Sequence, residues 1–319
     1  MAANDSAGPG VRLVQVAEDR AGQRLDNFLA GQFKGVPKSV IYRIVRTGQV
    51  RVNGKRAKPD TRLEGGDEVR LPPVRMDTPT DRGAPGAAQI RLLQDSVIFE
   101  DRAILAISKP SGIASHGGSG VAFGAIEILR AARPNETLEL VHRLDRDTSG
   151  VLVLARKRSA LTELQRLMRE GGVHKRYLSL LAGRIKREKF TVDAPLERSV
   201  LQGGERMVRV DAAGKDSVSH FRVIDRFASA SYVEVEIETG RTHQIRVHAG
   251  HSGHPVLGDD KYGDKSANAG IKRLGLKRLF LHAAELRFAL EDGAQPYVLN
   301  APLPDDLRMV LDRLVQGAG

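Results

Sequence analysis

The residues of this chain best suited to chemistry lie in one stretch, Val141-His-Arg-Leu-Asp-Arg-Asp-Thr-Ser-Gly150. In it the Asp145 carboxylate stands between two arginines, and the apolar run 151–155 follows directly. A loop that ends at a glycine and leads into a buried strand holds a polar side chain at a fixed place beside the core. We therefore expect Asp145 to carry the chemistry. The alternative for an Asp-x-Asp between two elements is a turn in which the aspartates cap backbone N–H groups.

Two later segments place further polar side chains on expected elements. Lys175-Arg-Tyr177 opens a strand, and a strand tyrosine most often lies at the edge of a core. Residues 232–238 alternate apolar residues with glutamates, which predicts a strand with one buried and one wet face. After the turn at Gly240-Arg241, Thr242 is well placed to cap a short helix that carries Arg246.

Four histidines, His243, His248, His251 and His254, raise the question of a metal site. Their spacings of five, three and three residues match no zinc motif, and no acidic ligand lies among them. We expect no metal here. The glycine-rich stretch 116–120 is also not a nucleotide loop, because the Lys-Ser or Lys-Thr of a phosphate-binding loop does not follow it.

The string His142-Arg-Leu-Asp145-x-x-Thr-Ser-Gly150 resembles the signature of the RluA family of RNA pseudouridine synthases. The run Gly240 to His248, the motif Gly258-Asp-x-x-Tyr-Gly263 and Leu281-His-Ala283 are similar to that family as well, so the resemblance spans Gly22 to about Pro304. It implies an α+β catalytic domain with the pseudouridine-synthase fold, a mixed and largely antiparallel sheet with flanking helices. The irregular succession of strands and helices also argues against a doubly wound fold. The implied reaction is the isomerisation of uridine to pseudouridine, with no cofactor.

The resemblance also implies roles for individual residues. Asp145 would act as the nucleophile or base, Arg246 would pair with it, and Tyr177 would lie against the target base. An opposite charge at contact distance favours the ionised form of a carboxylate. Arg143 would fill the gap that the flipped uridine leaves, and His142 and Arg241 would be further contacts to the substrate.

Composition places the chain among basic proteins without covalent cross-links. It has 319 residues, a formal net charge of +11 and no cysteine, which excludes disulfides, thiolate metal sites and thiol nucleophiles. Between Arg20 and Arg75 there are 13 Lys or Arg and 5 Asp or Glu, the footprint of a surface that binds a polyanion. Because no apolar run approaches the length of a membrane span, we expect a cytoplasmic protein with no membrane partner.

The basic segment predicts a small RNA-binding domain. Two short helices around the break Lys34-Gly-Val-Pro37, then a hairpin turning at Asn53-Gly54, resemble the S-four type of RNA-binding domain. On this interpretation a group of mostly basic residues follows the RNA backbone. The group comprises Arg24, Lys38, Ser39, Arg43, Arg46, Arg51, Asn53 and Lys55. A charged, solvated face without a ligand is the alternative.

These patterns divide the chain into four parts. We expect a disordered leader at 1–10, the S-four-type domain at 11–75, a linker rich in Pro, Gly and Ala at 76–89, and the catalytic domain at 90–319. The chain is expected to be a monomer.

Within the family, Lys34-Gly-Val-Pro-Lys-Ser39 and Arg51-Val-Asn-Gly-Lys55 most resemble the RluC branch, which modifies three uridines in bacterial 23S ribosomal RNA. The implied partner is 23S ribosomal RNA or its precursor. Three alternatives stay open: an RluD-like synthase that acts on other uridines of that RNA, a non-catalytic RNA-binding factor in ribosome assembly, and a metal-dependent RNA hydrolase built on Asp145, Asp147 and the histidines.

Overall fold

The computed structural model describes residues 10–33, 36, 38–73, 84–118, 121–200, 206–291 and 295–317. The chain divides into two compact units, Met1–Gly83 and Ala84–Gly319. Residues 1–9 of the expected leader and 76–83 of the expected linker lie outside the described residues. Helix α3 (Ala87–Asp95) begins inside the segment expected to be linker.

The N-terminal unit packs two helices against a small sheet. Its helices are α1 (Leu25–Gln32) and α2 (Lys38–Arg46), preceded by the short 3-10 helix η1 (Glu18–Arg20). The strands are β1 (Arg12–Gln15), β2 (Arg51–Val52), β3 (Lys55–Arg56) and β4 (Glu68–Leu71), which pair antiparallel in the order β1-β4-β2-β3. Phe28 and Ile41 of the two helices meet Leu63 and Val69 in one apolar core. The expected order of helix, turn, helix and hairpin is confirmed.

The hairpin of this unit turns at Asn53 and Gly54, as the sequence predicts. Both residues have positive φ, 49° and 73°, which is what a two-residue hairpin turn of the favoured type requires. The Asn53 side chain also joins the turn to the rest of the unit. Its amide donates to Asp67 Oδ1 at 2.7 Å and accepts the Glu68 N–H at 2.9 Å.

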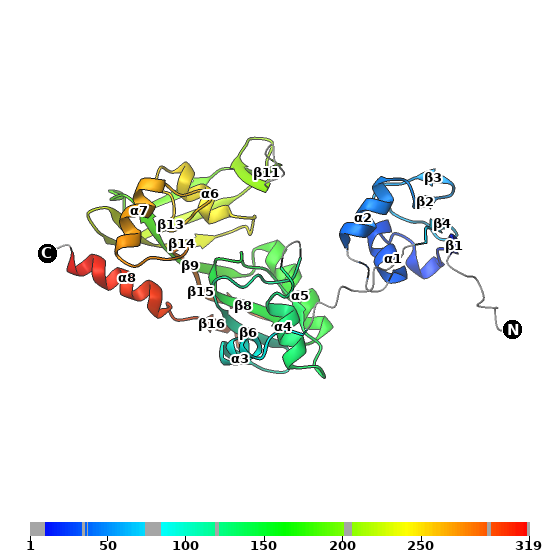
Figure 1. Ribbon diagram of the computed structural model, residues 1–319, viewed down its shortest axis with the longest axis horizontal. Coiled ribbons are helices and arrows are strands. Elements are labelled where there is room, and N and C mark those ends of the chain that lie inside the picture. The colour runs from blue at the N-terminus through cyan, green and yellow to red at the C-terminus, as the bar shows by residue number, and fades with distance from the viewer. Residues whose placement is uncertain are drawn as a thin grey trace. The chain divides into compact units, whose positions relative to one another are not determined.

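The C-terminal unit is built on one ten-stranded sheet (Figure 1). Eight strands follow the order β10-β13-β14-β9-β15-β8-β6-β5, with β16 beside β15 and β7 beside β8. The strands are β5 (Val97–Glu100), β6 (Ile104–Lys109), β7 (Glu139–Leu140), β8 (Ser149–Ala155), β9 (His174–Ala182), β10 (Lys189–Asp193), β13 (Val218–Arg226), β14 (Ala230–Ile237), β15 (Leu281–Phe288) and β16 (Tyr297–Asn300). A separate hairpin comprises β11 (Leu196–Val200) and β12 (Arg206–Val210).

The pairing makes this sheet mixed and mostly antiparallel, which confirms the expectation. Its parallel pair is β8 with β15, at the centre of the sheet. There Ser149 and Gly150 lie opposite His282 and Ala283. Gly150 has φ 113°, and a Cβ at this position would lie 2.1 Å from the Ala283 carbonyl oxygen, so only glycine lets the two strands approach.

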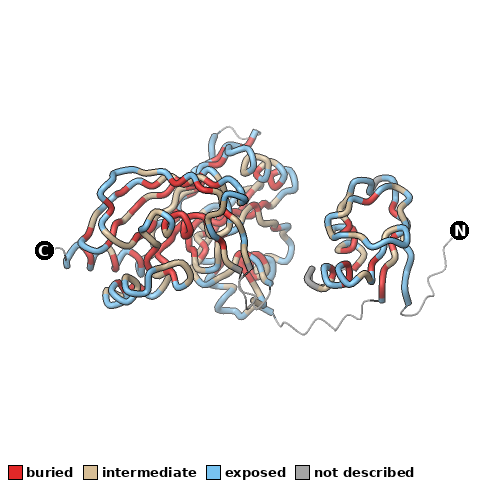
Figure 2. Tube along the Cα trace, turned by 90° about the horizontal axis from the view of Figure 1, so that it is seen from above, coloured by how far each residue is buried: buried red, intermediate tan, exposed pale blue. Residues whose placement is uncertain are grey.

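Helices cover the two faces of the sheet. They are α4 (Ala125–Ala132), α5 (Arg158–Glu170), α6 (Gln244–His251), α7 (Lys265–Arg273) and α8 (Asp305–Gln316). In β8, Val151 and Val153 pack in one core cluster with α5, whereas Leu152 and Leu154 pack in another with α3 and α4. This alternation explains why the run 151–155 is apolar throughout. Figure 2 shows the buried strands through the middle of the unit and exposed residues on its outer helices.

Among the residues that the structure describes, no helix has the length and apolar character that crossing a membrane requires.

Candidate active site

The loop that carries Asp145 is held in place through its backbone. Ser115 Oγ donates to the Leu144 carbonyl at 2.8 Å and accepts the Leu144 N–H at 2.9 Å. The fully buried Lys109 donates through Nζ to the Arg146 carbonyl at 3.1 Å, and Ser111 Oγ donates to the Asp147 carbonyl at 2.8 Å. The end of β6 and the segment after it thus support the loop on both sides of Asp145 and fix its position.

Lys109 is an unusual support because its charge is buried. Nζ also donates to the carbonyls of Pro110 and Ile113, at 2.8 and 2.7 Å. Burial lowers the pKa of Lys109 to about 7, while the nearby carboxylates Asp147 and Asp145 oppose that change. Three carbonyl acceptors match the three protons of an ammonium group, so this side chain joins the segment after β6 to the Asp145 loop.

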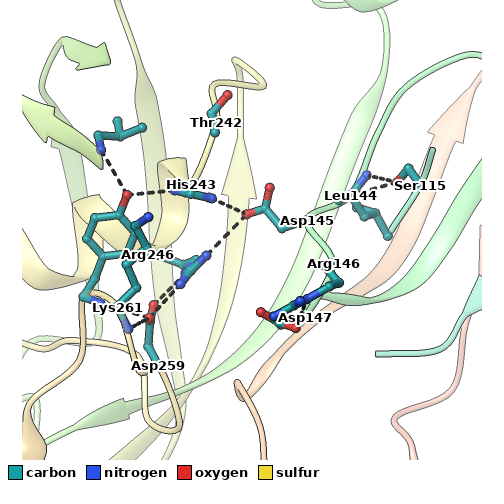
Figure 3. A network of polar contacts seen from close by, with 12 residues as sticks. Ser115, Leu144, Asp145, Arg146, Asp147, Thr242, His243, Arg246, Asp259 and Lys261 are labelled. Atoms are coloured by element: carbon teal, nitrogen blue, oxygen red, sulfur yellow. Dashed lines mark hydrogen bonds and ion pairs between the residues drawn. The ribbon is translucent and has the colours of Figure 1, made fainter. Parts of the chain in front are cut away.

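The Asp145 side chain is 19% exposed and faces two side chains from the start of α6. Its Oδ2 lies 3.8 Å from Arg246 Nη1 and 3.7 Å from His243 Nε2 (Figure 3). About a hundred residues of sequence separate the carboxylate from these partners, and the sheet brings them together. The expected pairing of Asp145 with Arg246 is present in the fold.

Arg246 is fixed from the side opposite Asp145. Its Nε and Nη2 donate to the two oxygens of Asp259 at 2.6 and 2.7 Å, and its guanidinium lies 5.0 Å from the centre of the Tyr262 ring. Burial opposes the charge on Arg246, but the hydrogen bonds to Asp259 and the charges of Asp259 and Asp145 outweigh it, and the pKa of Arg246 is raised. The guanidinium is therefore a permanent, oriented positive charge.

Tyr177 lines the same pocket from β9, where it lies opposite Val235 of β14 and Ala283 of β15. Its ring packs between the core clusters of the two halves of the sheet. Burial raises the pKa of Tyr177, and the negative charge of Asp145 acts in the same direction. The phenol is therefore protonated at neutral pH, and its ring supplies an apolar wall beside the carboxylate.

The three expected substrate contacts have different environments. Arg143 is exposed and lines the pocket beside Asp145. Arg241 also lines it, while its Nε donates to the Asp216 carbonyl at 3.1 Å. His142 is turned into the fold, where Nε2 accepts the Val153 N–H at 3.1 Å, and burial lowers the pKa of His142 to about 4. A neutral imidazole engaged by the backbone of β8 supports the strand.

The expected cap at Thr242 is wrong, and the reason lies in the backbone. Helix α6 begins one residue later, with His243 as its N-cap in the left-handed region at φ 55°. Gln244 Oε1 accepts the Arg241 N–H at 3.0 Å and the Thr239 hydroxyl at 2.8 Å, which closes the turn instead. The Thr242 hydroxyl accepts a hydrogen bond from Arg198.

The sequence interpretation treated the four histidines only as possible metal ligands and missed His243 as a site residue. His243 contacts Asp145, whereas His248 is buried between Ser219 Oγ and the Ala194 carbonyl, and His254 Nδ1 lies 2.9 Å from the Ala182 carbonyl. Within the described part of the chain, no three His, Cys, Asp or Glu side chains gather as a metal site. A histidine directly after a Gly-Arg-Thr turn was the available signal, since histidine is enriched among non-glycine residues with positive φ.

The N-terminal unit has a basic surface of its own. Arg43, Arg46, Arg51, Asn53 and Lys55 are exposed. A cavity beside α2 is lined by Tyr42, Val45, Arg46, Arg56, Ala57, Lys58 and Pro59. Arg56 and Lys58 were not predicted, because the residues chosen on the hairpin ended at Lys55, the first residue of β3. The side chains of Lys38 and Ser39 lie outside the described residues.

Arg24 differs from the other basic residues of this surface. It donates to both oxygens of Asp26, at 3.1 and 2.8 Å, and Tyr42 donates to the same carboxylate at 2.9 Å. The hydrogen bond from Arg24, together with that from Tyr42, lowers the pKa of Asp26 to about 2. The charge of Arg24 is thereby balanced within the unit.

Two family models match the chain. The model described as RNA pseudouridylate synthase matches residues 103–251, and the model described as S4 domain matches residues 23–69. The first match contains Asp145, Tyr177, His243 and Arg246, and the second contains the basic surface of the N-terminal unit.

Curated proteins resemble the chain along almost its whole length. The ribosomal large subunit pseudouridine synthase C of Salmonella typhi is 51% identical over 310 residues, which cover 96% of this chain and 97% of that protein. The protein of the same name from Escherichia coli (strain K12) is 50% identical over the same coverage. Among solved structures, human RNA pseudouridylate synthase domain containing 4 has a TM-score of 0.59 and 28% identity, covering 72% of this chain and 96% of its own. The expected fold class is confirmed.

Proposed function

The chain belongs to the RNA pseudouridylate synthase family, and from this premise we propose that it isomerises uridine to pseudouridine in the RNA of the large ribosomal subunit. The observation that carries this proposal is the pocket in which Asp145 faces Arg246, with Tyr177 as its wall. The pocket offers one carboxylate, one permanent cation and one aromatic face, and the proposed reaction needs groups of this kind.

The reaction breaks the bond between ribose C1′ and uracil N1 and forms a bond from C1′ to C5. The proton on C5 is lost and N1 gains one, so product and substrate contain the same atoms. Asp145 can act in three ways: attack at C1′, attack on the pyrimidine ring, or removal of a ribose proton. In each, Arg246 would orient the carboxylate with a positive charge that Asp259 holds in place from the other side.

The other pocket residues act on the base. A uridine must leave its stack before the carboxylate can reach it, at a cost of a few kcal/mol. Arg143, exposed at the pocket beside Asp145, would fill the gap in the RNA, and Arg241 would contact the backbone next to it. Tyr177 would pack on the extruded uracil, and its phenol would take part in proton transfer from C5.

The N-terminal unit would bind the RNA through its phosphates, without recognising its base sequence. Exposed Arg43, Arg46, Arg51 and Lys55, together with Asn53, would follow phosphates, and Arg56 and Lys58 extend the same surface. Tyr42 is the aromatic residue of this cavity. Lys38 and Ser39 remain predicted contacts. Arg24 would contribute less because Asp26 balances its charge.

We further propose 23S ribosomal RNA or its precursor as the substrate, with three uridines modified, and a cytoplasmic monomer as the active form. The identity to large-subunit synthases along nearly the whole chain supports this choice. An RluD-like set of uridines is the alternative target.

The test is to incubate the purified chain with large-subunit ribosomal RNA transcripts and map pseudouridine at each position. We expect pseudouridine at a few defined uridines with the native protein and none with Asp145→Asn, which still binds the RNA. Pseudouridine at other uridines of the same RNA would favour the RluD-like alternative. RNA binding without any pseudouridine would favour a non-catalytic assembly factor. RNA cleavage that EDTA abolishes would favour a metal-dependent hydrolase.

A further inference from the structure

His243 contacts the same oxygen of Asp145 as Arg246 does. The two distances to Oδ2, 3.7 Å from His243 Nε2 and 3.8 Å from Arg246 Nη1, are nearly equal. Figure 3 shows the second oxygen of Asp145 pointing away from both partners. Oδ2 thus contacts two protein side chains, while the other oxygen contacts neither of them.

The hydrogen bonds around Tyr262 determine which nitrogen of His243 carries the proton. The Val208 N–H donates to Tyr262 Oη at 3.0 Å, so the phenol's own proton is available for His243 Nδ1, 2.7 Å away. Burial raises the pKa of Tyr262, which keeps that proton on the phenol. With Nδ1 as the acceptor, the neutral imidazole carries its hydrogen on Nε2 and directs it at Asp145.

The groups around His243 keep its ring neutral at pH 7. Burial lowers the pKa of His243 below 6.5, and Arg246 and Lys261 act in the same direction, while Asp145 and Asp259 oppose them. Arg246 therefore supplies the positive charge at Oδ2, and His243 supplies a neutral N–H donor. The two partners have different functions although they meet one atom.

The backbone of His243 is held in a conformation that few side chains adopt. Its φ of 55° places it in the left-handed region, and a non-glycine residue there indicates a constraint from its surroundings. A turn alone would be better served by glycine or asparagine. What the histidine adds is a ring that spans from Tyr262 to Asp145, two groups on different segments of the chain.

We infer that His243 is a positioning residue for Asp145: its Nε2–H, set by the Tyr262 hydroxyl, holds Oδ2 so that the other carboxylate oxygen faces the bound uridine. This inference rests on the proposed function. Apo sites often show such contacts at long distance, and they shorten when substrate excludes water. The inference adds a neutral donor to the pair of Asp145 with Arg246.

The experiment compares His243→Ala with His243→Gln under single turnover at saturating ribosomal RNA transcript. Both variants must adopt the left-handed backbone conformation of residue 243, but only glutamine places an N–H near the position of Nε2. We expect His243→Ala to slow pseudouridine formation by about 10- to 100-fold, the usual effect of removing a supporting donor, with the RNA Kd within about 2-fold of the native value. His243→Gln should recover at least about 5-fold of that rate.

Two further variants separate positioning from folding and from the proposed function. Tyr262→Phe keeps the ring beside Arg246 and removes the phenol proton, so it should slow the chemical step in the same direction as His243→Ala. His251→Ala, an exposed position on the same helix, should behave as the native chain. Equal rates for His243→Ala and the native chain, or no recovery with glutamine, would overturn the inference alone. A native chain that makes no pseudouridine would overturn the proposed function instead.

Discussion

Arg246 donates two hydrogen bonds to Asp259, at 2.6 and 2.7 Å, and presents its third nitrogen to Asp145 at 3.8 Å. The flat guanidinium thus lies between a carboxylate that is completely buried and one that remains 19% exposed. The buried carboxylate orients the cation, and the exposed one is left for chemistry. Lysine could not form this arrangement, because its single nitrogen lacks the fork geometry.

Replacing Asp259 with Asn should damage both stability and catalysis. The amide removes the charge that balances buried Arg246, and breaking a buried ion pair costs about 3–5 kcal/mol. We expect a loss of that order in the free energy of unfolding and a pseudouridine formation rate lower by about 10- to 100-fold. Denaturant unfolding and single-turnover assays measure the two effects. A variant with native stability and native rate would show that Arg246 is oriented by other groups.

Removal of the Tyr177 hydroxyl should affect RNA binding less than the rate of pseudouridine formation. Tyr177→Phe keeps the ring that forms the pocket wall, so RNA binding should stay within about 2-fold. Because the phenol is protonated at neutral pH, its oxygen can take up the C5 proton only as it passes its own proton on to another acceptor. Loss of this relay should slow pseudouridine formation by about 10²-fold, the contribution of a general acid or base. Tyr177→Ala should reduce both the RNA affinity and the rate of pseudouridine formation. A Phe variant as fast as the native chain would limit Tyr177 to packing.

Gly150→Ala should be among the most destabilising small changes in the sheet. The new Cβ would meet the Ala283 carbonyl oxygen at 2.1 Å, at a φ of 113°. Separation of β8 from β15 should cost more than about 3 kcal/mol of unfolding free energy. Gly270→Ala is the matched control, since Gly270 lies within α7 with nothing within 4 Å of the added Cβ. The control should be neutral or stabilise by up to about 1 kcal/mol, as alanine does in helices.

Mild acid should destabilise the C-terminal unit through His282. Its Nδ1 pairs with Ser149 Oγ at 2.9 Å and its Nε2 with the Ala301 carbonyl at 3.0 Å, and burial lowers the pKa of His282 to about 4. The folded pKa lies below the ordinary 6.5, so between pH 6.5 and 4 the unfolded chain binds the extra proton. Stability therefore falls as the pH falls through that window, by about 2 kcal/mol for this residue between pH 7 and 5.

Denaturant unfolding at pH 7 and pH 5 tests this dependence. His282→Gln removes the titrating group, so the difference between the two pH values should shrink by about 2 kcal/mol. His142, whose pKa burial also lowers to about 4, adds a loss of the same sign that remains in the variant. An unchanged difference would mean that His282 accepts its proton in the folded state.

The basic cavity of the N-terminal unit should control RNA affinity more than catalytic rate. Arg46→Ala and Arg56→Ala each remove one cation from the cavity, so each should reduce the slope of log affinity against log salt by about 1. Arg24→Ala is the internal comparison. Because Arg24 is paired with Asp26 at 2.8 Å, its removal should change the slope less. Filter binding of ribosomal RNA transcripts over a salt series measures all three.

Features set by neighbouring residues could be predicted from the sequence. The Asn53-Gly54 turn depends on two positive φ angles that these residue types favour. The run 151–155 predicted a buried strand because both of its faces are covered. The meeting of Asp145 with Arg246 was implied by resemblance to a family, since neither spacing nor periodicity relates residues so far apart.

Features set by distant contacts could not be predicted. The helical pattern after Gly240 was recognised, but the left-handed turn at His243 depends on Gln244, Thr239 and Tyr262 together. Asp259 belongs to the motif Gly258-Asp-x-x-Tyr-Gly263, to which the sequence assigned no role in the site, and its position behind Arg246 becomes visible only in the fold. The parallel pairing of β8 with β15 joins segments more than a hundred residues apart, for which local sequence carries no signal.

The pairing of β8 with β15 has a consequence for how the protein folds during its synthesis. During synthesis the carboxylate loop and the arginine helix leave the ribosome well before β15, the central strand against which both halves of the sheet are aligned. Sheets with such non-local contacts fold slowly. Asp145 and Arg246 are therefore aligned only once β15 has joined the two halves of the sheet, and a chain that ended before β15 would contain both side chains without an assembled site.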